Sequence, residues 1–214
     1  QVWSNGYAGV WLMKPNGGRV LDSTANGNHG TIYGATATQG PTGTALAFDG
    51  VDDYVQTSGY VEIGENPLTM EVVARTGRGT HSQVVMELLP SQSITYWRGQ
   101  IQVPLGATYD PLFYMKNERY QYANNRSSLD NQPHYFVGVD PRLSDNIIYF
   151  YIDKTLQQSG RSSSRDSFTE YLSAKVRFSN PTTGLQGDIY YATLSSVARS
   201  PAWIAATNAV LHDT

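Results

Sequence analysis

A loop beginning at Asp22 carries oxygen-bearing side chains at the spacing of a calcium-binding loop. Asp22, Thr24 and Asn26 stand at alternate positions, and Gly27 follows them. An EF-hand needs a bidentate glutamate at the end of such a loop and a helix on either side, whereas this sequence has Tyr33 at that position and no flanking helical pattern. We therefore expect a turn in which Asp22 and Asn26 bond their own backbone, with glycine supplying positive φ.

A second acidic turn, "DGVDD", places Asp49, Asp52 and Asp53 within one short stretch. Hard cations such as Ca²⁺ bind carboxylate and backbone carbonyl oxygens, so this turn has suitable ligand chemistry. The pair Asp49-Gly50 is also typical of a tight turn between two strands. Both interpretations, a cation site and an ordinary turn, stay open at this point.

The remaining carboxylates and histidines are poorly arranged for catalysis. A retaining glycosidase needs two carboxyl groups about 5–5.5 Å apart. Asp52 and Asp53 are adjacent, so in an extended strand they point to opposite faces. The chain has 4 histidines at no close zinc-binding spacing, and it has no cysteine. We predict a non-enzymatic protein in which His29 is a packed or hydrogen-bonded loop residue; a carboxylate pair brought together from distant strands is the alternative.

Aromatic side chains mixed with amides and a guanidinium predict a ligand-binding surface. The candidate ligand-binding residues are Tyr96, Trp97, Arg98, Tyr120, Tyr122 and Asn124. Aromatic rings stack on the apolar faces of sugars, and amides bond their hydroxyls. The same residue types dominate protein–protein hot spots, and core packing explains many single tyrosines, so three interpretations stay open.

These residues must be positioned by strands, because helical periodicity is almost absent. Short alternating or apolar stretches recur between Gly-, Pro-, Asn- and Asp-rich turns, which is typical of an antiparallel sandwich or barrel. The expected strands are Val10–Met13, Ala45–Phe48, Asp53–Gln56, Leu68–Arg75, Gln83–Leu89, Ser93–Trp97, Gln100–Val103, Leu112–Lys116, Arg119–Ala123, His134–Val139, Ile147–Ile152, Lys175–Phe178 and Gly187–Leu194. One helix is expected at Ala202–Val210, capped by Ser200, with Trp203 anchoring it to the sandwich.

The composition fits one globular domain over residues 1–214, and it excludes several classes of function. Only 15% of the residues are charged and the net charge is −3, so no basic surface exists for nucleic acid. No apolar run is long enough for membrane insertion. A polar, tyrosine-rich and charge-poor chain is typical of a secreted protein or an extracellular domain at the cell surface.

Four blocks of the sequence together resemble a known family. They are "LDSTANGNHGTIYGATAT", "GTALAFDGVDDYVQT" at Gly43–Thr57, "IIYFYIDKTLQQSG" at Ile147–Gly160 and "GLQGDIYYATLSSVARSPAWIAA" at Gly184–Ala206. In order and spacing they resemble the concanavalin A-like, laminin G-like domains found in secreted microbial proteins. The likeness covers nearly the whole chain and is most specific in its first two blocks. Lys154 stands where the family has a turn glycine.

The resemblance implies an all-β fold, an antiparallel jelly-roll β-sandwich with one short C-terminal helix. It also implies a lectin-like domain without catalysis that binds glycans or proteins and often holds a structural calcium. The calcium ligands implied by the resemblance are Asp49, Asp188 and backbone oxygens near Gly50, with Asp22 as a weaker addition. Alginate lyases of this fold carry Gln-Ile-His, whereas this chain has Gln102 in place of the histidine.

Two functional hypotheses follow, from different classes. The first is a carbohydrate-binding recognition or adhesion module whose partner is a glycan or a cell-surface protein. The second is a structural subunit that self-associates into an extracellular filament, spike or capsid-like assembly. The two-faced apolar stretch Ile147–Ile152 permits this self-assembly. A polysaccharide hydrolase or lyase is the third alternative.

Overall fold

A computed structural model of the chain describes residues 3–41, 43–76, 81–91, 99–103, 110–115, 119–123, 128–142, 147–161 and 173–212. The strands are β1 Tyr7–Asn16, β2 Arg19–Asp22, β3 Gly30–Tyr33, β4 Thr36–Gly40, β5 Gly43–Asp49, β6 Tyr54–Thr57, β7 Val61–Glu62, β8 Leu68–Thr76, β9 Gln83–Pro90, β10 Gly99–Val103, β11 Leu112–Met115, β12 Arg119–Tyr122, β13 Pro133–Asp140, β14 Ile147–Ile152, β15 Thr155–Arg161, β16 Ser173–Phe178 and β17 Gln186–Ser195. The single described α-helix is α1, Pro201–His212. None of the described helices is long and apolar enough to cross a membrane.

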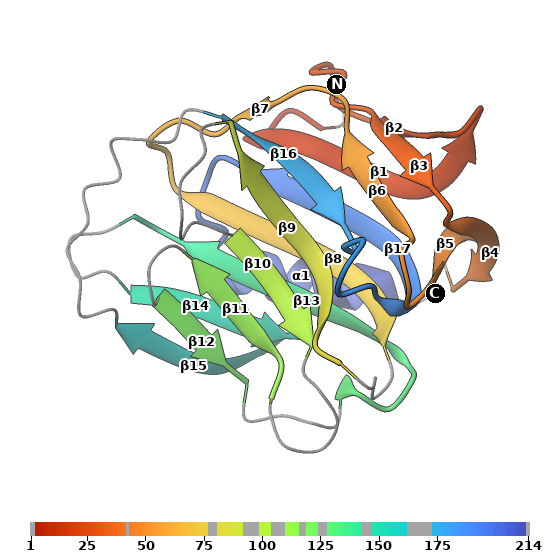
Figure 1. The fold of residues 1–214 in the computed structure, drawn as a ribbon. Helices are drawn as coiled ribbons and strands as arrows, with labels where there is room; N and C mark the ends of the chain where they lie inside the picture. Colours follow the sequence, from red (N-terminus) through yellow and green to blue (C-terminus); the bar gives the residue numbers. More distant parts are fainter. Residues whose placement is uncertain are drawn as a thin grey trace.

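The strands form two antiparallel sheets packed face to face (Figure 1). The first sheet has the order β4-β5-β17-β8-β13-β14-β15. The second has the order β2-β3-β6-β16-β9-β10-β11-β12, with β7 beside β6 along β16. Strand β1 pairs with β17 through its first half and with β2 through its second half, so it joins the two sheets.

The main core lies between the sheets and follows from the alternation of each strand. In β16, Ala174, Val176 and Phe178 are buried, while Lys175 and Arg177 between them are half-buried on the outer face. Trp11 and Phe178 meet edge to face with ring centroids 5.2 Å apart. Other fully buried side chains of this core include Phe113, Phe136, Phe150, Met70 and Leu46.

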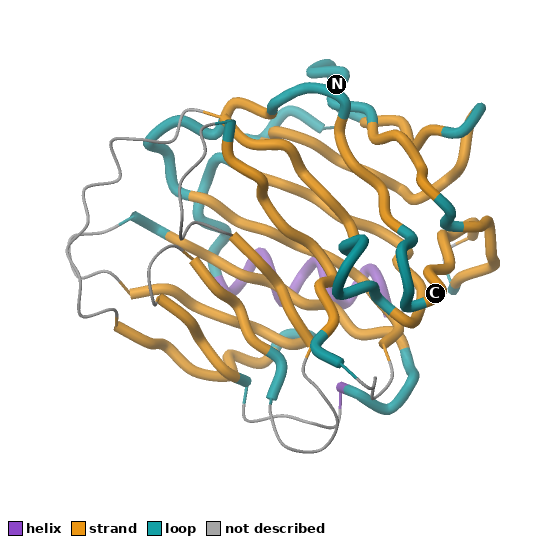
Figure 2. The backbone as a smooth tube through the Cα atoms, viewed as in Figure 1, coloured by secondary structure: helices purple, strands orange, loops and turns teal. Residues whose placement is uncertain are grey.

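Helix α1 covers the outer face of the first sheet and gives that sheet a second apolar layer (Figure 2). Strand β8 is therefore buried on both faces, unlike a strand with one solvated face. Ser200 caps the helix as expected, because the backbone N–H of Trp203 donates to Ser200 Oγ at 3.2 Å. The anchor differs from the expectation: Ile204 is fully buried, whereas Trp203 lies beside it, partly exposed. Ile204 faces the sheet, and Trp203 lies at the edge of the helix interface.

The predicted all-β sandwich with one C-terminal helix is confirmed. The turn Asp153-Lys154 joins β14 to β15, and the positive φ, of 55°, is taken by Asp153 and not by Lys154, which stands where the family has glycine. Strands β2, β3, β4, β7 and β15 were not predicted, because each is short or polar. The expected strand at Ser93–Trp97 lies outside the described residues.

Candidate functional site

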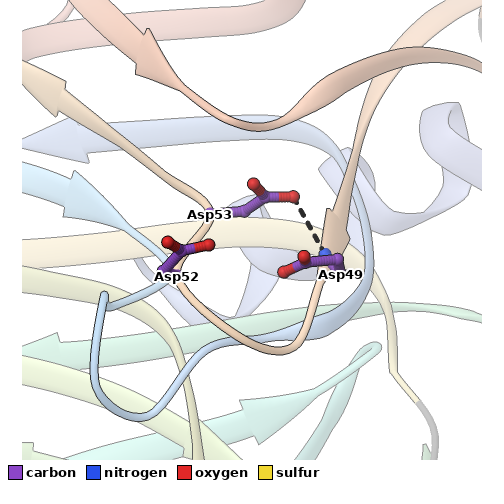
Figure 3. A group of neighbouring side chains, drawn as sticks. All are labelled: Asp49, Asp52 and Asp53. Carbon is purple, nitrogen blue, oxygen red and sulfur yellow. Dashed lines mark hydrogen bonds between the residues drawn. The ribbon is translucent and has the colours of Figure 1, made fainter.

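The acidic turn after β5 gathers three carboxylates (Figure 3). Oxygen atoms of Asp49, Asp52 and Asp53 all lie within 4.8 Å of one another. Asp49 and Asp52 are exposed, and Asp53 is buried. Carboxylates at this separation, two of them accessible to solvent, are a donor set that fits a hard cation.

The turn is also held by its own hydrogen bonds. The Asp49 N–H donates to Asp53 Oδ2 at 3.0 Å, and the Val51 N–H donates to Asp49 Oδ1 at 2.8 Å. Gly50 has a φ of 84°, as the turn requires. Burial raises the pKa of the Asp53 carboxyl, the Asp49 N–H opposes this, and the neighbouring charges of Asp49 and Asp52 raise the pKa further. A bound cation would relieve that repulsion.

Asp188 lies near Asp49 but is bound to an arginine. Arg75 contacts Asp188 Oδ2 through Nη2 at 2.5 Å and through Nε at 2.7 Å. The Tyr190 hydroxyl donates to the same oxygen at 3.2 Å. Asp49, Arg75 and Asp188 line one pocket of about 390 Å³ with Gln186. The structure therefore brings Asp49 and Asp188 to one pocket, with the Arg75 guanidinium already neutralising Asp188.

Asp22 is the last residue of β2 and organises the loop that follows this strand. Its Oδ1 accepts hydrogen bonds from the N–H groups of Val10 and Thr24, at 3.0 and 2.9 Å. Its Oδ2 accepts from the Thr24 hydroxyl and the Asn28 N–H, at 2.8 and 2.9 Å. His29 Nδ1 accepts from the Asp22 N–H at 3.0 Å, which confirms the expected hydrogen-bonded loop histidine. The two bonds from Thr24 are those expected of a turn residue, whereas the bond from Val10 ties the turn to β1.

A polar row crosses the outer face of the second sheet, on the side away from the core. Its members are opposite one another in adjacent strands, in the order Thr31, Gln56, Arg177, Glu87, Gln100 and Tyr114. Residues on either side of these positions belong to the buried core, which fixes the row on the opposite face. This face is polar in its centre and aromatic toward both ends.

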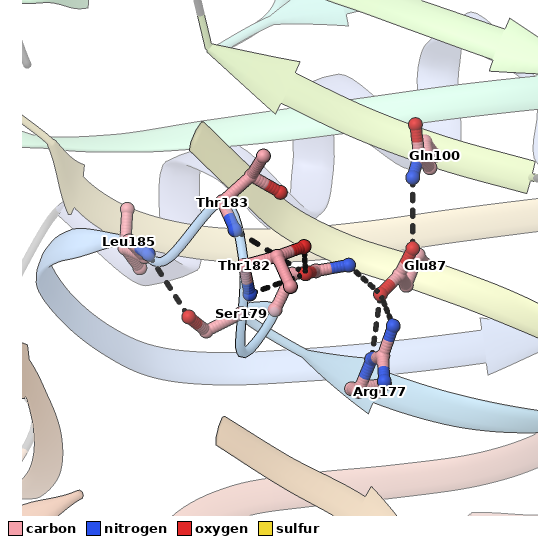
Figure 4. Close-up of polar contacts among 8 residues, drawn as sticks. Glu87, Gln100, Arg177, Ser179, Thr182, Thr183 and Leu185 are labelled. Carbon is pink, nitrogen blue, oxygen red and sulfur yellow. Dashed lines mark hydrogen bonds and ion pairs between the residues drawn. The ribbon is translucent and has the colours of Figure 1, made fainter. Parts of the chain in front are cut away.

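Glu87 is the centre of this row and has no exposed side-chain surface (Figure 4). Arg177 donates to Glu87 Oε1 through Nε at 2.6 Å and Nη2 at 2.5 Å. Asn180 donates to the same oxygen at 2.8 Å, and Gln100 donates to Oε2 at 2.8 Å. Every bond that Glu87 makes in the described chain is to a donor that neutralises or solvates it. These donors account for how a carboxylate without exposed surface is stabilised at the centre of the row.

Two tyrosines lie beside the β3–β6 end of the row, two positions along these strands from Thr31 and Gln56. The rings of Tyr33 and Tyr54 stack with centroids 4.4 Å apart and planes 14° apart. Tyr33 is 45% exposed, so this stack faces solvent. The Arg177 guanidinium carbon lies 5.9 Å from the Tyr54 ring centroid. We call Tyr33, Tyr54, Gln56 and Arg177 the tyrosine strip.

Beyond the strip, the same face of β16 leads to a third tyrosine. Lys175 lies two residues before Arg177 on the same face of β16, and its Nζ is 5.5 Å from the centroid of the Tyr60 ring. Tyr60 is 48% exposed. An exposed series of tyrosine rings with an amide, a guanidinium and an ammonium between them suits the stacking and hydroxyl bonding of sugars.

Four of the six ligand-binding residues predicted from sequence, Tyr96, Trp97, Arg98 and Asn124, lie outside the described residues. The backbone of β12 places Tyr120 opposite Tyr114 and Tyr122 opposite Leu112, at the far end of the same sheet. Those residues remain predicted ligand contacts.

The tyrosine strip itself was missed by sequence reasoning. Tyr33 and Tyr54 pair across β3 and β6, and β4 and β5 lie between them in the chain. The usable signal was the alternation of "YVQT", in which Val55 faces the core and Tyr54 must face outward. Alternation within one strand predicts which face of the sheet a tyrosine lies on. It does not predict that Tyr33 and Tyr54 lie opposite each other, because that depends on which strands pair.

Comparisons with known proteins identify the fold. No protein-family model and no curated protein sequence matches this chain. The structure is similar to the binding domain of botulinum neurotoxin DC, solved in complex with rat synaptotagmin II (TM-score 0.70, 12% identity) and with SialylT (TM-score 0.71, 11% identity). Each likeness covers 97% of this chain and 52% of the other, so this chain spans about half the length of those structures.

A second kind of structure is also similar. A mutant of Trypanosoma rangeli sialidase displaying trans-sialidase activity matches with a TM-score of 0.68 and 11% identity, over 94% of this chain and 32% of the other. At such low identities the likeness establishes a shared β-sandwich fold and nothing about a shared ligand.

Proposed function

We propose that this chain is a non-catalytic recognition module that binds a glycan on the tyrosine strip. The observation that carries the proposal is the solvent-facing stack of Tyr33 on Tyr54 beside Arg177. Stacked, exposed rings contribute nothing to the core between the sheets, yet they expose apolar surface with hydrogen-bonding groups around it. That combination matches the apolar face and hydroxyl rim of a sugar ring.

The wider context supports a binding role. Structures of the same fold include domains solved in complex with synaptotagmin II and with SialylT, which makes a glycan or a cell-surface protein a consistent class of partner. The fully buried carboxylates of the described chain, Glu71, Glu87 and Asp140, are closed off from any substrate. We also propose that residues 1–214 form one domain of the concanavalin A-like type, in a secreted or cell-surface protein.

Affinity electrophoresis in gels containing soluble polysaccharides tests the glycan proposal. Retardation by at least one polysaccharide is expected, and Tyr33→Ala or Tyr54→Ala should weaken the apparent affinity about tenfold, the equivalent of 1.4 kcal/mol. Leu156→Ala is the matched control, because Leu156 is 44% exposed on β15 of the other sheet. Unchanged retardation in both tyrosine variants, with folding verified by circular dichroism, would contradict the proposal.

We further propose that a structural calcium binds the turn of Asp49, Asp52 and Asp53, with carbonyl oxygen near Gly50. The three close carboxylates and the raised pKa of Asp53 support it. Calcium should raise the melting temperature of the wild type and leave that of Asp52→Asn unchanged. With calcium the wild type should therefore melt at a higher temperature than Asp52→Asn. In a chelator the wild type should melt at the lower temperature, because Asp52→Asn removes a repulsive charge. Equal melting temperatures of the wild type with calcium and with chelator would exclude the site.

The second candidate function is a structural subunit that assembles with copies of itself. It is favoured by the two edges of the first sheet, because among the described strands β4 pairs only with β5 and β15 only with β14. Unpaired edge strands present free N–H and C=O groups to another chain. Light scattering and electron microscopy of the purified protein distinguish the candidates: ordered polymers support assembly, and a glycan-binding monomer supports recognition.

A further inference from the structure

A polar pocket lies where the tyrosine strip ends, between the start of β1, the loop that follows β2 and strand β7. Its volume is about 510 Å³, within the range of small-molecule sites. Tyr60, Glu62, Asn26, Asn28 and Ser196 line it together with Gly6, Tyr7, Ala8 and Val61. Strand β7 and the start of β1 lie at the same end of the sandwich (Figure 1).

Two amides of this pocket are fixed by β1. Asn26 Nδ2 donates to the carbonyl oxygens of Tyr7 and Ala8 at 3.2 and 3.1 Å. Asn28 Nδ2 donates to the Ala8 carbonyl oxygen at 2.8 Å. Because β1 holds each nitrogen, the Oδ1 atom of each amide is turned away from those carbonyls. Neither Oδ1 accepts a hydrogen bond from the described part of the chain, so two preorganised acceptors remain.

Glu62 adds a third acceptor group. It is exposed at the end of β7, and its carboxylate has no hydrogen bond or ion pair in the described chain. The pocket therefore holds more acceptors than donors, next to the exposed ring of Tyr60. A ligand rich in hydroxyl groups supplies the missing donors and an apolar ring face for Tyr60.

An ammonium ligand also supplies donors, and the Glu62 carboxylate would attract it. Lys175 lies over the Tyr60 ring, with Nζ 5.5 Å from the centroid. Its positive charge repels a second cation at short range and so opposes the attraction of Glu62. The two charges act in opposite directions on an amine, whereas a neutral sugar uses the acceptors and the ring without either effect.

We propose that this pocket binds one neutral hexopyranose, the terminal sugar of the glycan that lies along the tyrosine strip. This inference rests on the proposed function. It adds where the binding surface ends and which kind of sugar is bound at that end. The ring of the sugar stacks on Tyr60. Its hydroxyl groups donate to Asn26 Oδ1, Asn28 Oδ1 and the Glu62 carboxylate.

The test titrates ¹⁵N-labelled protein with the methyl pyranosides of glucose, galactose, mannose and N-acetylglucosamine, and separately with butylammonium. At least one pyranoside should shift the side-chain amide signals of Asn26 and Asn28, and Glu62→Ala should weaken that binding at least tenfold. Glu65→Ala is the matched control, because Glu65 is an exposed carboxylate in the next loop that does not line the pocket. Shifts with butylammonium alone, shifts with no probe, or unchanged affinity in Glu62→Ala would overturn the inference.

Polysaccharide retardation separates failure of this inference from failure of the proposed function. If Tyr54→Ala reduces retardation and no pyranoside enters the pocket, the strip binds glycan and the pocket assignment is wrong. If a pyranoside binds the pocket and the polysaccharide retards Tyr54→Ala as much as the wild type, the pocket assignment stands and the strip does not bind glycan.

Discussion

Arg177 binds Glu87 through two nitrogen atoms, at 2.6 and 2.5 Å, at a point where Glu87 has no exposed surface. The same guanidinium lies 5.9 Å from the Tyr54 ring centroid. Arg177 therefore links a buried ion pair to the exposed tyrosine strip. Because Glu87 fixes one end of this side chain, the strip is preorganised by the network beneath it.

Removal of Glu87 should be strongly destabilising. Glu87→Ala leaves Arg177 without its counter-charge in a largely buried position, and breaking such a pair costs about 3–5 kcal/mol. Urea unfolding should show this loss in the free energy of unfolding. The double variant Glu87→Leu with Arg177→Met, which buries no charge, should recover most of it. A loss below about 1 kcal/mol in Glu87→Ala would show that the pair is not buried in solution.

Gly34 should be essential to the acidic turn. Its φ is 78°, and a Cβ atom there would lie 1.8 Å from Asp53 Oδ1. Gly34→Ala adds that clash to the strain of positive φ, which alone costs about 1–2 kcal/mol. Gly17→Ala is the control, because Gly17 has a φ of 56° with open space around it. Chemical denaturation should show a larger loss for Gly34→Ala, and Asp53→Ala in the same chain should reduce the difference. Equal losses for the two glycine variants would show that Asp53 moves freely.

Ile204 should carry most of the attachment of α1. It is fully buried on the outer face of the first sheet, so Ile204→Ala should lower the free energy of unfolding by about 2–5 kcal/mol. Val210, on the same helix and 72% exposed, is the control, and Val210→Ala should change stability by less than about 0.5 kcal/mol. Similar losses in both variants, measured by thermal and urea unfolding, would mean that the helix is attached by a different face.

The strands of the core could be predicted from sequence because burial imposes a period of two on each of them. "KVRF" in β16 and "YVQT" in β6 each show which side chains face the core. Contacts between distant strands carry no such signal. Arg75 reaches Asp188 across 113 positions, and no local pattern indicated that this aspartate was already neutralised. Acidic residues that are close in the sequence, by contrast, can be predicted to lie close in space. Asp49, Asp52 and Asp53 stand within one short turn, and their carboxylates do lie together.

The pH dependence of stability should contain a contribution from His134. Its Nδ1 lies 3.1 Å from Asp153 Oδ2 and its Nε2 lies 3.1 Å from Asp130 Oδ1. Burial lowers the pKa of His134, but the hydrogen bonds and charges of Asp153 and Asp130 outweigh it and raise the pKa above its ordinary value. A raised pKa means that the folded protein binds the proton more tightly than the unfolded chain.

The stabilisation from protonated His134 is therefore complete below the unfolded pKa of about 6.5 and is lost as the pH rises through the folded pKa. His134→Gln should lower the free energy of unfolding more at pH 5.5 than at pH 8.5. The difference should be about 1 kcal/mol or less, because both aspartates are partly exposed. Urea unfolding of both proteins at the two pH values measures it, with His29→Gln as the control histidine variant. A larger effect at pH 8.5 would show that His134 is held in its neutral form.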